Sequence, residues 1–134
     1  MVQLSKRLLT IASQIPQNSR VADIGTDHAL LPVFLAENGR ILHAVAGDVN
    51  PGPVKSARAQ VKGANLEHKV DVRQGDGLDV ISPHEVDTIV IAGMGGALIC
   101  DILNSGRDKL QGIRRLILQP NVGEDRVRRW LYEN

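Results

Sequence analysis

Five short apolar runs, spaced along the whole chain, constrain the fold more than any other feature. They lie at residues 20–24, 43–47, 70–74, 87–92 and 115–119. Their β-branched residues alternate little with polar ones, which is typical of parallel strands covered by helices on both faces. A segment with helical character follows each run. We therefore predict an α/β fold, a Rossmann-like doubly wound parallel sheet with right-handed crossovers.

Capping and helix-ending signals agree with this plan. Ser5 can cap a first helix that ends near Pro16 and has one apolar face. That face consists of Leu8, Ile11, Ala12 and Ile15. Two further helices have a proline near the start and a glycine after the end, namely Pro32 with Gly39 and Pro53 with Gly63. No linker or repeat interrupts the pattern, so residues 1–134 are predicted to form one domain.

Composition excludes several classes of protein. Of the 134 residues, 43% are hydrophobic and 23% are charged, which indicates a folded globular chain. Only 2% are aromatic, so no platform exists for stacking successive bases of a single strand. No run approaches the ~20 apolar residues that a membrane span requires. The single cysteine, Cys100, is interpreted as a small buried hydrophobe, which fits a reducing cytoplasm, and no metal site is expected.

Charge is distributed unevenly. Between Ser105 and Leu131 there are seven basic and three acidic residues, a local charge of +4. A polyanion can dock on such a segment, but a solvated helix face has the same composition. Trp130 forms an apolar face with Val127 and Leu131 in the last helix, for which core packing is favoured over base stacking.

The loop after the first strand is the first candidate binding element. Gly25 lets the chain turn close to a ligand, and the following helix N-terminus can offer N–H groups to an anion. A dinucleotide fingerprint requires glycines two and five residues after Gly25, where this chain has Asp27 and Leu30. A single glycine near acids suits a ligand that has an ammonium, a carboxylate, a ribose and an adenine, as S-adenosylmethionine does. His28 in the same loop either takes part or packs locally.

Acids also follow the next two strands. Asp48 comes 25 residues after Asp23, close to the interval at which an acid meets ribose hydroxyls in nucleotide-binding folds. NAD would use the same acid, and a turn acid is the alternative. After the third strand Asp76 stands between Gly75 and Gly77, where it can accept from an adenine amino group. Together with Asp23, these acids predict an adenosine site at the strand tips.

Small and amide residues follow the last two strands. The fourth ends at Gly93, Met94, Gly95 and Gly96, which allow close approach at a pocket mouth or simply begin a helix. The fifth ends at Gln119, Pro120 and Asn121, whose amides can bind a base edge or form a polar surface turn.

Five segments together resemble one family. They are LSKRL, DIGTDHALLP, RQGDGLDVI, IAGMGGALI and RLILQPN. In this order and spacing they resemble the bacterial tRNA (adenine(22)-N1)-methyltransferases, the TrmK-like enzymes. The resemblance runs from Ser5 to Leu131. It implies a class I methyltransferase fold, S-adenosylmethionine as methyl donor, tRNA as acceptor, and no metal.

The residues singled out above fall into three roles under this resemblance. The predicted donor-binding set is Asp23, Gly25, Thr26, Asp48, Asp76, Gly77, Gly93, Met94 and Gly95. The predicted catalytic residues are Asp27 and His28, and the predicted substrate-binding residues are Gly96, Gln119, Pro120 and Asn121.

The resemblance also bears on the extent of the domain. The family continues with further strands and a helical C-terminal extension, so this chain is expected to be a methyltransferase core without those parts. Methylation of a protein or small molecule is the first alternative. The second is a non-catalytic module that binds an adenosine ligand or RNA. An NAD oxidoreductase is disfavoured by the loop at Gly25.

Overall fold

A single five-stranded parallel sheet forms the centre of the computed structural model, which describes residues 2–134. Its strands are β1 (Ser19–Ile24), β2 (Ile41–Asp48), β3 (Val70–Gln74), β4 (Thr88–Met94) and β5 (Arg115–Pro120). Their order in the sheet is β3-β2-β1-β4-β5, and every pairing is parallel. The predicted doubly wound sheet is confirmed, and the direction of winding reverses between β1 and β4.

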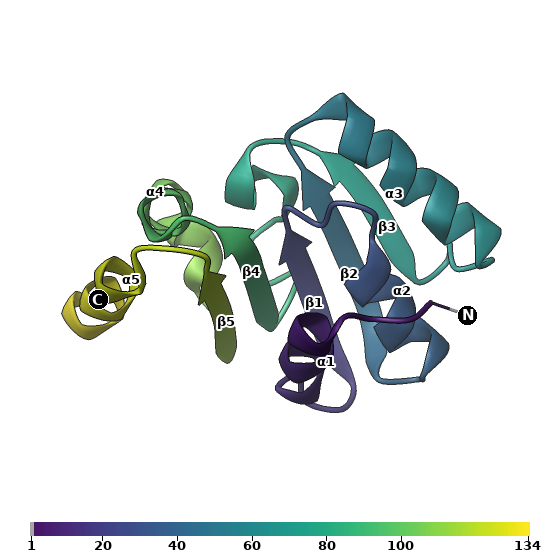
Figure 1. The fold of residues 1–134 in the computed structure, drawn as a ribbon, viewed down its shortest axis with the longest axis horizontal. Coiled ribbons are helices and arrows are strands. Elements are labelled where there is room, and N and C mark those ends of the chain that lie inside the picture. The colour runs from purple at the N-terminus through teal and green to yellow at the C-terminus, as the bar shows by residue number, and fades with distance from the viewer. Residues whose placement is uncertain (1) are drawn as a thin grey trace.

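Helices cover both faces of the sheet (Figure 1). They are α1 (Lys6–Ser13), α2 (Leu30–Glu37) and α3 (Pro51–Gly63) on one face, and α4 (Gly96–Ser105) and α5 (Glu124–Glu133) on the other. Two 3-10 helices, η1 (Gly77–Val80) and η2 (Arg107–Leu110), complete the elements. Within residues 2–134, no helix is long and apolar enough to cross a membrane.

One expected helix is missing: the segment between β3 and β4 holds only the four-residue η1. Leu78, Val80 and Ile81 are buried there, so the connection still covers the sheet. Pro83 cannot continue a helix because it lacks an N–H. His84 has a φ of 65°, and the Glu85 carboxylate accepts from the backbone N–H of Ser82 at 2.9 Å. A tight turn therefore replaces the helix.

The two helical layers enclose separate apolar cores. Residues such as Leu35 and Ala57 pack against Val21 and Val90 on the α1–α3 side. The core on the other side includes the buried residues Ile89, Ile91, Ile99, Leu103 and Val127. This division explains why the strand sequences alternate so little, because both faces of each central strand are buried.

Two sequence interpretations in the C-terminal half need correction. Val127 is buried and Trp130 is half-buried against the core, but Leu131 is 47% exposed, so it does not join their apolar face. Cys100 is half-buried rather than fully buried, and its thiol donates to the carbonyl of Arg126 at 3.6 Å. Burial raises the pKa of the Cys100 thiol.

Candidate functional site

A cavity of about 460 Å³ lies at the carboxyl ends of β1, β2, β3 and β4. It opens at the point where the winding of the sheet reverses, which is where ligands bind in open α/β sheets. Its walls include ten of the predicted residues: Asp23, Gly25, Thr26, Asp27, His28, Asp48, Asp76, Gly77, Gly93 and Met94. The topology thus brings residues from four separate tips to one volume.

The loop after β1 is held in an unusual conformation. Gly25, Asp27 and Ala29 have φ values of 72°, 59° and 58°, in the left-handed region that non-glycine residues rarely adopt. The N–H groups of Gly25 and Thr26 both donate to the carbonyl of Gly47, at 2.9 and 3.0 Å. These two N–H groups therefore tie the loop to β2, so any N–H group offered to a ligand must come from the start of α2, as the sequence predicted.

Asp23 at the end of β1 is the most perturbed acid at the cavity. It is only 7% exposed, and its Oδ2 accepts from the Thr26 hydroxyl at 2.8 Å. Burial raises the pKa of Asp23 to about 7, the Thr26 hydrogen bond opposes that rise, and the Asp48 carboxylate adds to it. The positive charge of Arg7 lowers the pKa of Asp23. A cationic ligand group beside Asp23 would favour its ionised form.

Asp48 and Asp76 lie at the tips of β2 and β3. One oxygen of Asp48 accepts from the backbone N–H of Asn50 at 3.1 Å, which fixes the carboxylate and leaves its second oxygen for a ligand. Val49 beside it lines the cavity and is 54% exposed. Asp76 is exposed and lies two residues after the end of β3, next to Gly77 with its φ of 55°. Two acids and an apolar side chain thus share one part of the cavity.

The tip of β4 divides into two parts. Gly93 and Met94 line the cavity, and the Met94 side chain packs on Gly25, where an added Cβ would lie 2.4 Å from the Met94 Cε. Gly95 and Gly96 are not among the lining residues. Gly96 is the buried first residue of α4, and an added Cβ would lie 2.1 Å from the carbonyl oxygen of Gly123, the N-cap of α5. Close helix approach explains why position 96 is glycine.

The predicted residues at the tip of β5 also lie outside the cavity lining. The N–H of Asn121 donates to the carbonyl of Met94 at 2.8 Å, and Pro120 pairs with Met94 in the sheet. The Gln119 side chain accepts from the N–H of Gly93 at 3.2 Å and from Arg7 Nη1 at 2.8 Å. These residues therefore stand behind the cavity wall and contact residues that form it.

Asp27 and His28 point toward solvent at the mouth of the cavity. Their side chains are 72% and 56% exposed, and the Asp27 carboxylate lies 3.6 Å from His28 Nε2. Both remain within reach of a ligand in the cavity, because both belong to its lining.

Sequence reasoning missed several lining residues, of which Arg7 is the most informative. Arg7 projects from α1, and its hydrogen bond to Gln119 spans 112 positions of the sequence. A basic residue on a helix surface has no local signature of such a contact, and the one available signal was the family-like segment LSKRL, which contains Arg7. Further apolar lining residues are Leu8, Leu30, Leu31, Val49, Leu98 and Ile102.

Comparison with known proteins places this site in a family. Residues 4–134 match the family described as "Methyltransferase domain". The tRNA (adenine(22)-N(1))-methyltransferase of Bacillus subtilis (strain 168) is 52% identical over 132 residues, which cover 98% of this chain and 56% of that enzyme.

Two solved structures match with ligands bound. A Streptococcus pneumoniae protein in complex with S-adenosyl-L-methionine has a TM-score of 0.95 and 45% identity, covering 98% of this chain and 62% of that one. M. capricolum TrmK in complex with S-adenosyl-homocysteine has a TM-score of 0.88 and 32% identity, with coverages of 97% and 57%. The chain thus spans less than two thirds of the length of these relatives. Because the family match extends over nearly every residue described above, this chain belongs to the methyltransferase domain family.

Proposed function

We propose that this chain binds S-adenosylmethionine in the strand-tip cavity and takes part in transferring its methyl group to N1 of an adenine in tRNA. The observation that carries the proposal is the arrangement of charge around the cavity. Two acids, Asp48 and Asp76, lie at the tips of β2 and β3. At the tip of β1, the positive charge of Arg7 lowers the pKa of the buried Asp23 carboxyl. The relatives that match the chain include structures with this donor and with its product.

The amino-acid tail of the donor is a zwitterion, and Asp23 and Arg7 suit its two ends. The Asp23 carboxylate can accept from the ammonium, which would offset the cost of keeping a charge in a buried position. The Arg7 guanidinium can pair with the tail carboxylate. A pyrophosphate would instead place negative charge beside Asp23, so a dinucleotide is a poorer fit.

The adenosine part of the donor fits the other tips. The unengaged oxygen of Asp48 can accept from the ribose hydroxyls, and Asp76 can accept from the adenine amino group. Val49 offers an apolar surface for the adenine ring. These roles remain predictions for this chain.

The main requirement that this reaction places on the protein is to position the donor methyl group and the adenine N1 atom. When bound, S-adenosylmethionine supplies a methyl group on a positively charged sulfur. The N1 atom of adenine carries a free lone pair at neutral pH, so no strong base has to act. Holding the reacting atoms in line is worth up to about 7–11 kcal/mol. Asp27, exposed at the cavity mouth, can stabilise the positive charge that develops on the methylated adenine.

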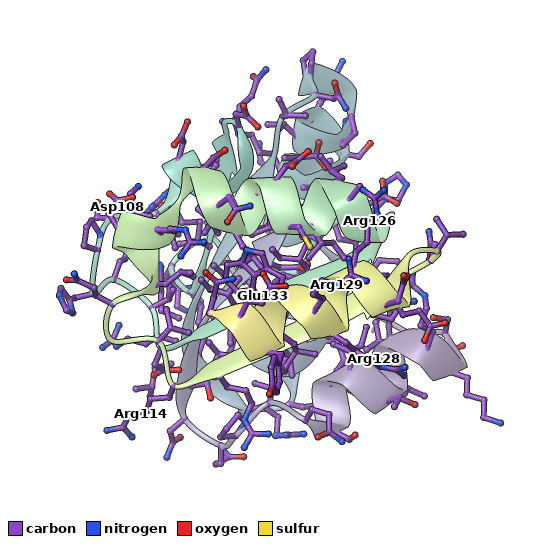
Figure 2. All side chains as sticks on the ribbon, turned by 90° about the vertical axis from the view of Figure 1, so that its left-hand side faces the viewer. Asp108, Arg114, Arg126, Arg128, Arg129 and Glu133 are labelled. Carbon is purple, nitrogen blue, oxygen red and sulfur yellow. The ribbon has the colours of Figure 1, made fainter. Side chains whose placement is uncertain are left out.

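The acceptor is proposed from the relatives and from surface charge. The B. subtilis relative is a tRNA (adenine(22)-N(1))-methyltransferase. Figure 2 shows Arg126, Arg128 and Arg129 along α5, with Arg114 near the start of β5. These arginines are exposed, and only Arg128 has an acidic partner within 4 Å in residues 2–134, Glu124 at 3.6 Å. Such a face can contact the phosphates of RNA. With tRNA as the acceptor, we propose that the reaction takes place in the cytoplasm.

Target accessibility limits which adenines can react. N1 lies on the Watson–Crick edge, so the target must be unpaired or extruded from its helix to enter the site.

Methyl transfer to RNA is the direct test. The full chain is incubated with unmodified tRNA and methyl-labelled S-adenosylmethionine, and the labelled nucleoside is identified after digestion. We expect label in N1-methyladenosine. Label in a protein or small molecule would replace the acceptor, and donor binding without transfer to any tRNA would favour a binding module.

A further inference from the structure

The Gln119 amide at the tip of β5 makes three hydrogen bonds. Its Oε1 accepts from the N–H of Gly93 at 3.2 Å and from Arg7 Nη1 at 2.8 Å, and its Nε2 donates to the carbonyl of Pro120 at 3.1 Å. A flipped amide would face two donors with its own amino group. The three partners therefore fix one orientation, and both acceptor positions of Oε1 are used.

The anchor of Gln119 comes from an irregularity in the sheet. The register between β4 and β5 shifts between Ala92 and Met94, so Gly93 has no partner residue in the β5 ladder. Its N–H donates instead to the Gln119 side chain. Two of the three partners of Gln119 are thus backbone groups of adjacent strand tips, which makes the amide a rigid acceptor.

Arg7 is the third partner and the only one that is a side chain. It lies on an exposed face of α1 and lines the cavity, whereas Gln119 does not. A free arginine side chain loses rotamer entropy when a ligand orders it. The hydrogen bond to Gln119 restricts that freedom beforehand and leaves the other guanidinium N–H groups available. Gly93 does not crowd the guanidinium, because an added Cβ at this position would lie 3.5 Å from Arg7 Nη1, an ordinary van der Waals distance.

We infer that Gln119 is a positioning residue that holds the Arg7 guanidinium at the cavity wall, where Arg7 pairs with the carboxylate of the donor's amino-acid tail. This inference rests on the proposed donor and deepens it. Gln119 then acts on donor binding through Arg7, rather than by reading the acceptor base. The electrostatic effect of Arg7 on the Asp23 carboxyl is consistent with a guanidinium that faces the cavity.

A comparison of two ligands tests the inference. S-adenosylhomocysteine has the amino-acid tail, whereas 5′-methylthioadenosine has the same nucleoside without it. In Gln119→Met we expect the affinity for S-adenosylhomocysteine to fall about tenfold, measured by calorimetry on the full chain, with little change for 5′-methylthioadenosine. Gln17→Met is the matched control, because Gln17 donates to the carbonyl of Gly39 at 2.7 Å and lies outside the cavity lining.

A double-mutant cycle checks the route of the effect. If Gln119 acts through Arg7, then Gln119→Met should add little to the loss caused by Arg7→Met. Gln119→Glu gives a second test, because its carboxylate would pair with Arg7 and compete with the tail, again weakening only S-adenosylhomocysteine. Unchanged affinity in both Gln119 variants, or equal losses for both ligands, overturns the role of Gln119. Absence of S-adenosylhomocysteine binding to the unsubstituted chain overturns the proposed donor itself.

Discussion

Among single residues, Asp23 links the stability of the fold to the proposed binding. Its pKa is about 7 in the folded chain against an ordinary value of 3.8, chiefly because the carboxyl is buried. Between about pH 4 and pH 7 the folded protein therefore keeps a proton that the unfolded chain has released. The resulting stabilisation is present below pH 4 and is lost as the pH rises through 7.

We expect Asp23→Asn to remove this pH dependence. The amide oxygen can still accept from Thr26, but no charge has to be buried at high pH. The variant should be more stable than the parent at pH 8, by up to roughly 4 kcal/mol, and should bind S-adenosylhomocysteine more weakly. Urea unfolding at pH 5 and pH 8 measures the difference, with the exposed Asp79→Asn as control. Equal pH profiles for parent and Asp23→Asn would contradict the argument.

Asp27 tests the proposed chemistry at the same scale. Its φ of 59° favours asparagine as the replacement, since asparagine tolerates the left-handed region better than alanine does. We expect Asp27→Asn to lower turnover about tenfold while donor affinity changes little, because only the charge beside the methylated base is lost. Single-turnover transfer and calorimetry separate the two quantities. An unchanged transfer rate would remove Asp27 from the mechanism.

The sequence identified some candidate residues for a clear physical reason. Asp48 ends β2 and Asp76 lies just after β3, and the carboxyl ends of parallel strands share one edge, so their convergence on the cavity could be predicted. Arg7 could not be found this way, because its place depends on how α1 packs against the finished sheet. Gln119 was found as a tip residue, but its contact with Arg7 was not foreseen.

Among the elements, all five strands were predicted within two residues at each end, because short apolar runs with both faces buried stand out in the sequence. The β3–β4 connection was predicted wrongly as a helix. Its buried residues lie in a short 3-10 turn, which lacks the ~3.6-residue period of an α-helix. Glycine spacing was equally ambiguous. The run at the end of β4 contains Gly93, which lines the cavity, and Gly96, which lets two helices approach.

Gly96→Ala tests the packing role of that glycine. The added Cβ would meet the backbone of Gly123, which cannot move without shifting α5, so we expect a loss of about 3 kcal/mol or more in unfolding free energy. Gly52→Ala in α3 is the matched control, because nothing lies within 4 Å of its added Cβ. There we expect a gain of up to about 1 kcal/mol from helix propensity. Denaturant unfolding of both variants decides, and equal stabilities would contradict the close approach.

For the whole molecule, the prediction concerns how RNA is held. The helix that carries these exposed cations begins near the tip of β4, because Asn121 in the loop before α5 donates its N–H to the carbonyl of Met94. We expect the combined Arg126→Gln, Arg128→Gln and Arg129→Gln variant to bind tRNA more weakly. Its salt dependence should also be shallower, by roughly one unit of slope per lost phosphate contact.

An equal loss of charge on the opposite face provides the control. Lys55, Arg58 and Lys62 are exposed on α3, and their replacement by glutamine should have a much smaller effect. Binding is measured by filter retention over a series of salt concentrations. If the α3 variant weakens binding as much as the α5 variant, the contact is not specific to α5.

The loop that leads into α5 is fastened to the loop that leads into α4 at two points. Asn121 donates its N–H to the carbonyl of Met94 at 2.8 Å, and Gly96 donates to the carbonyl of Val122 at 2.7 Å. The pair of loops is thus clamped on both sides of Gly95 and cannot shift separately. We therefore expect a displacement that a docked RNA imposes on the start of α5 to reach Met94, at the wall of the donor cavity.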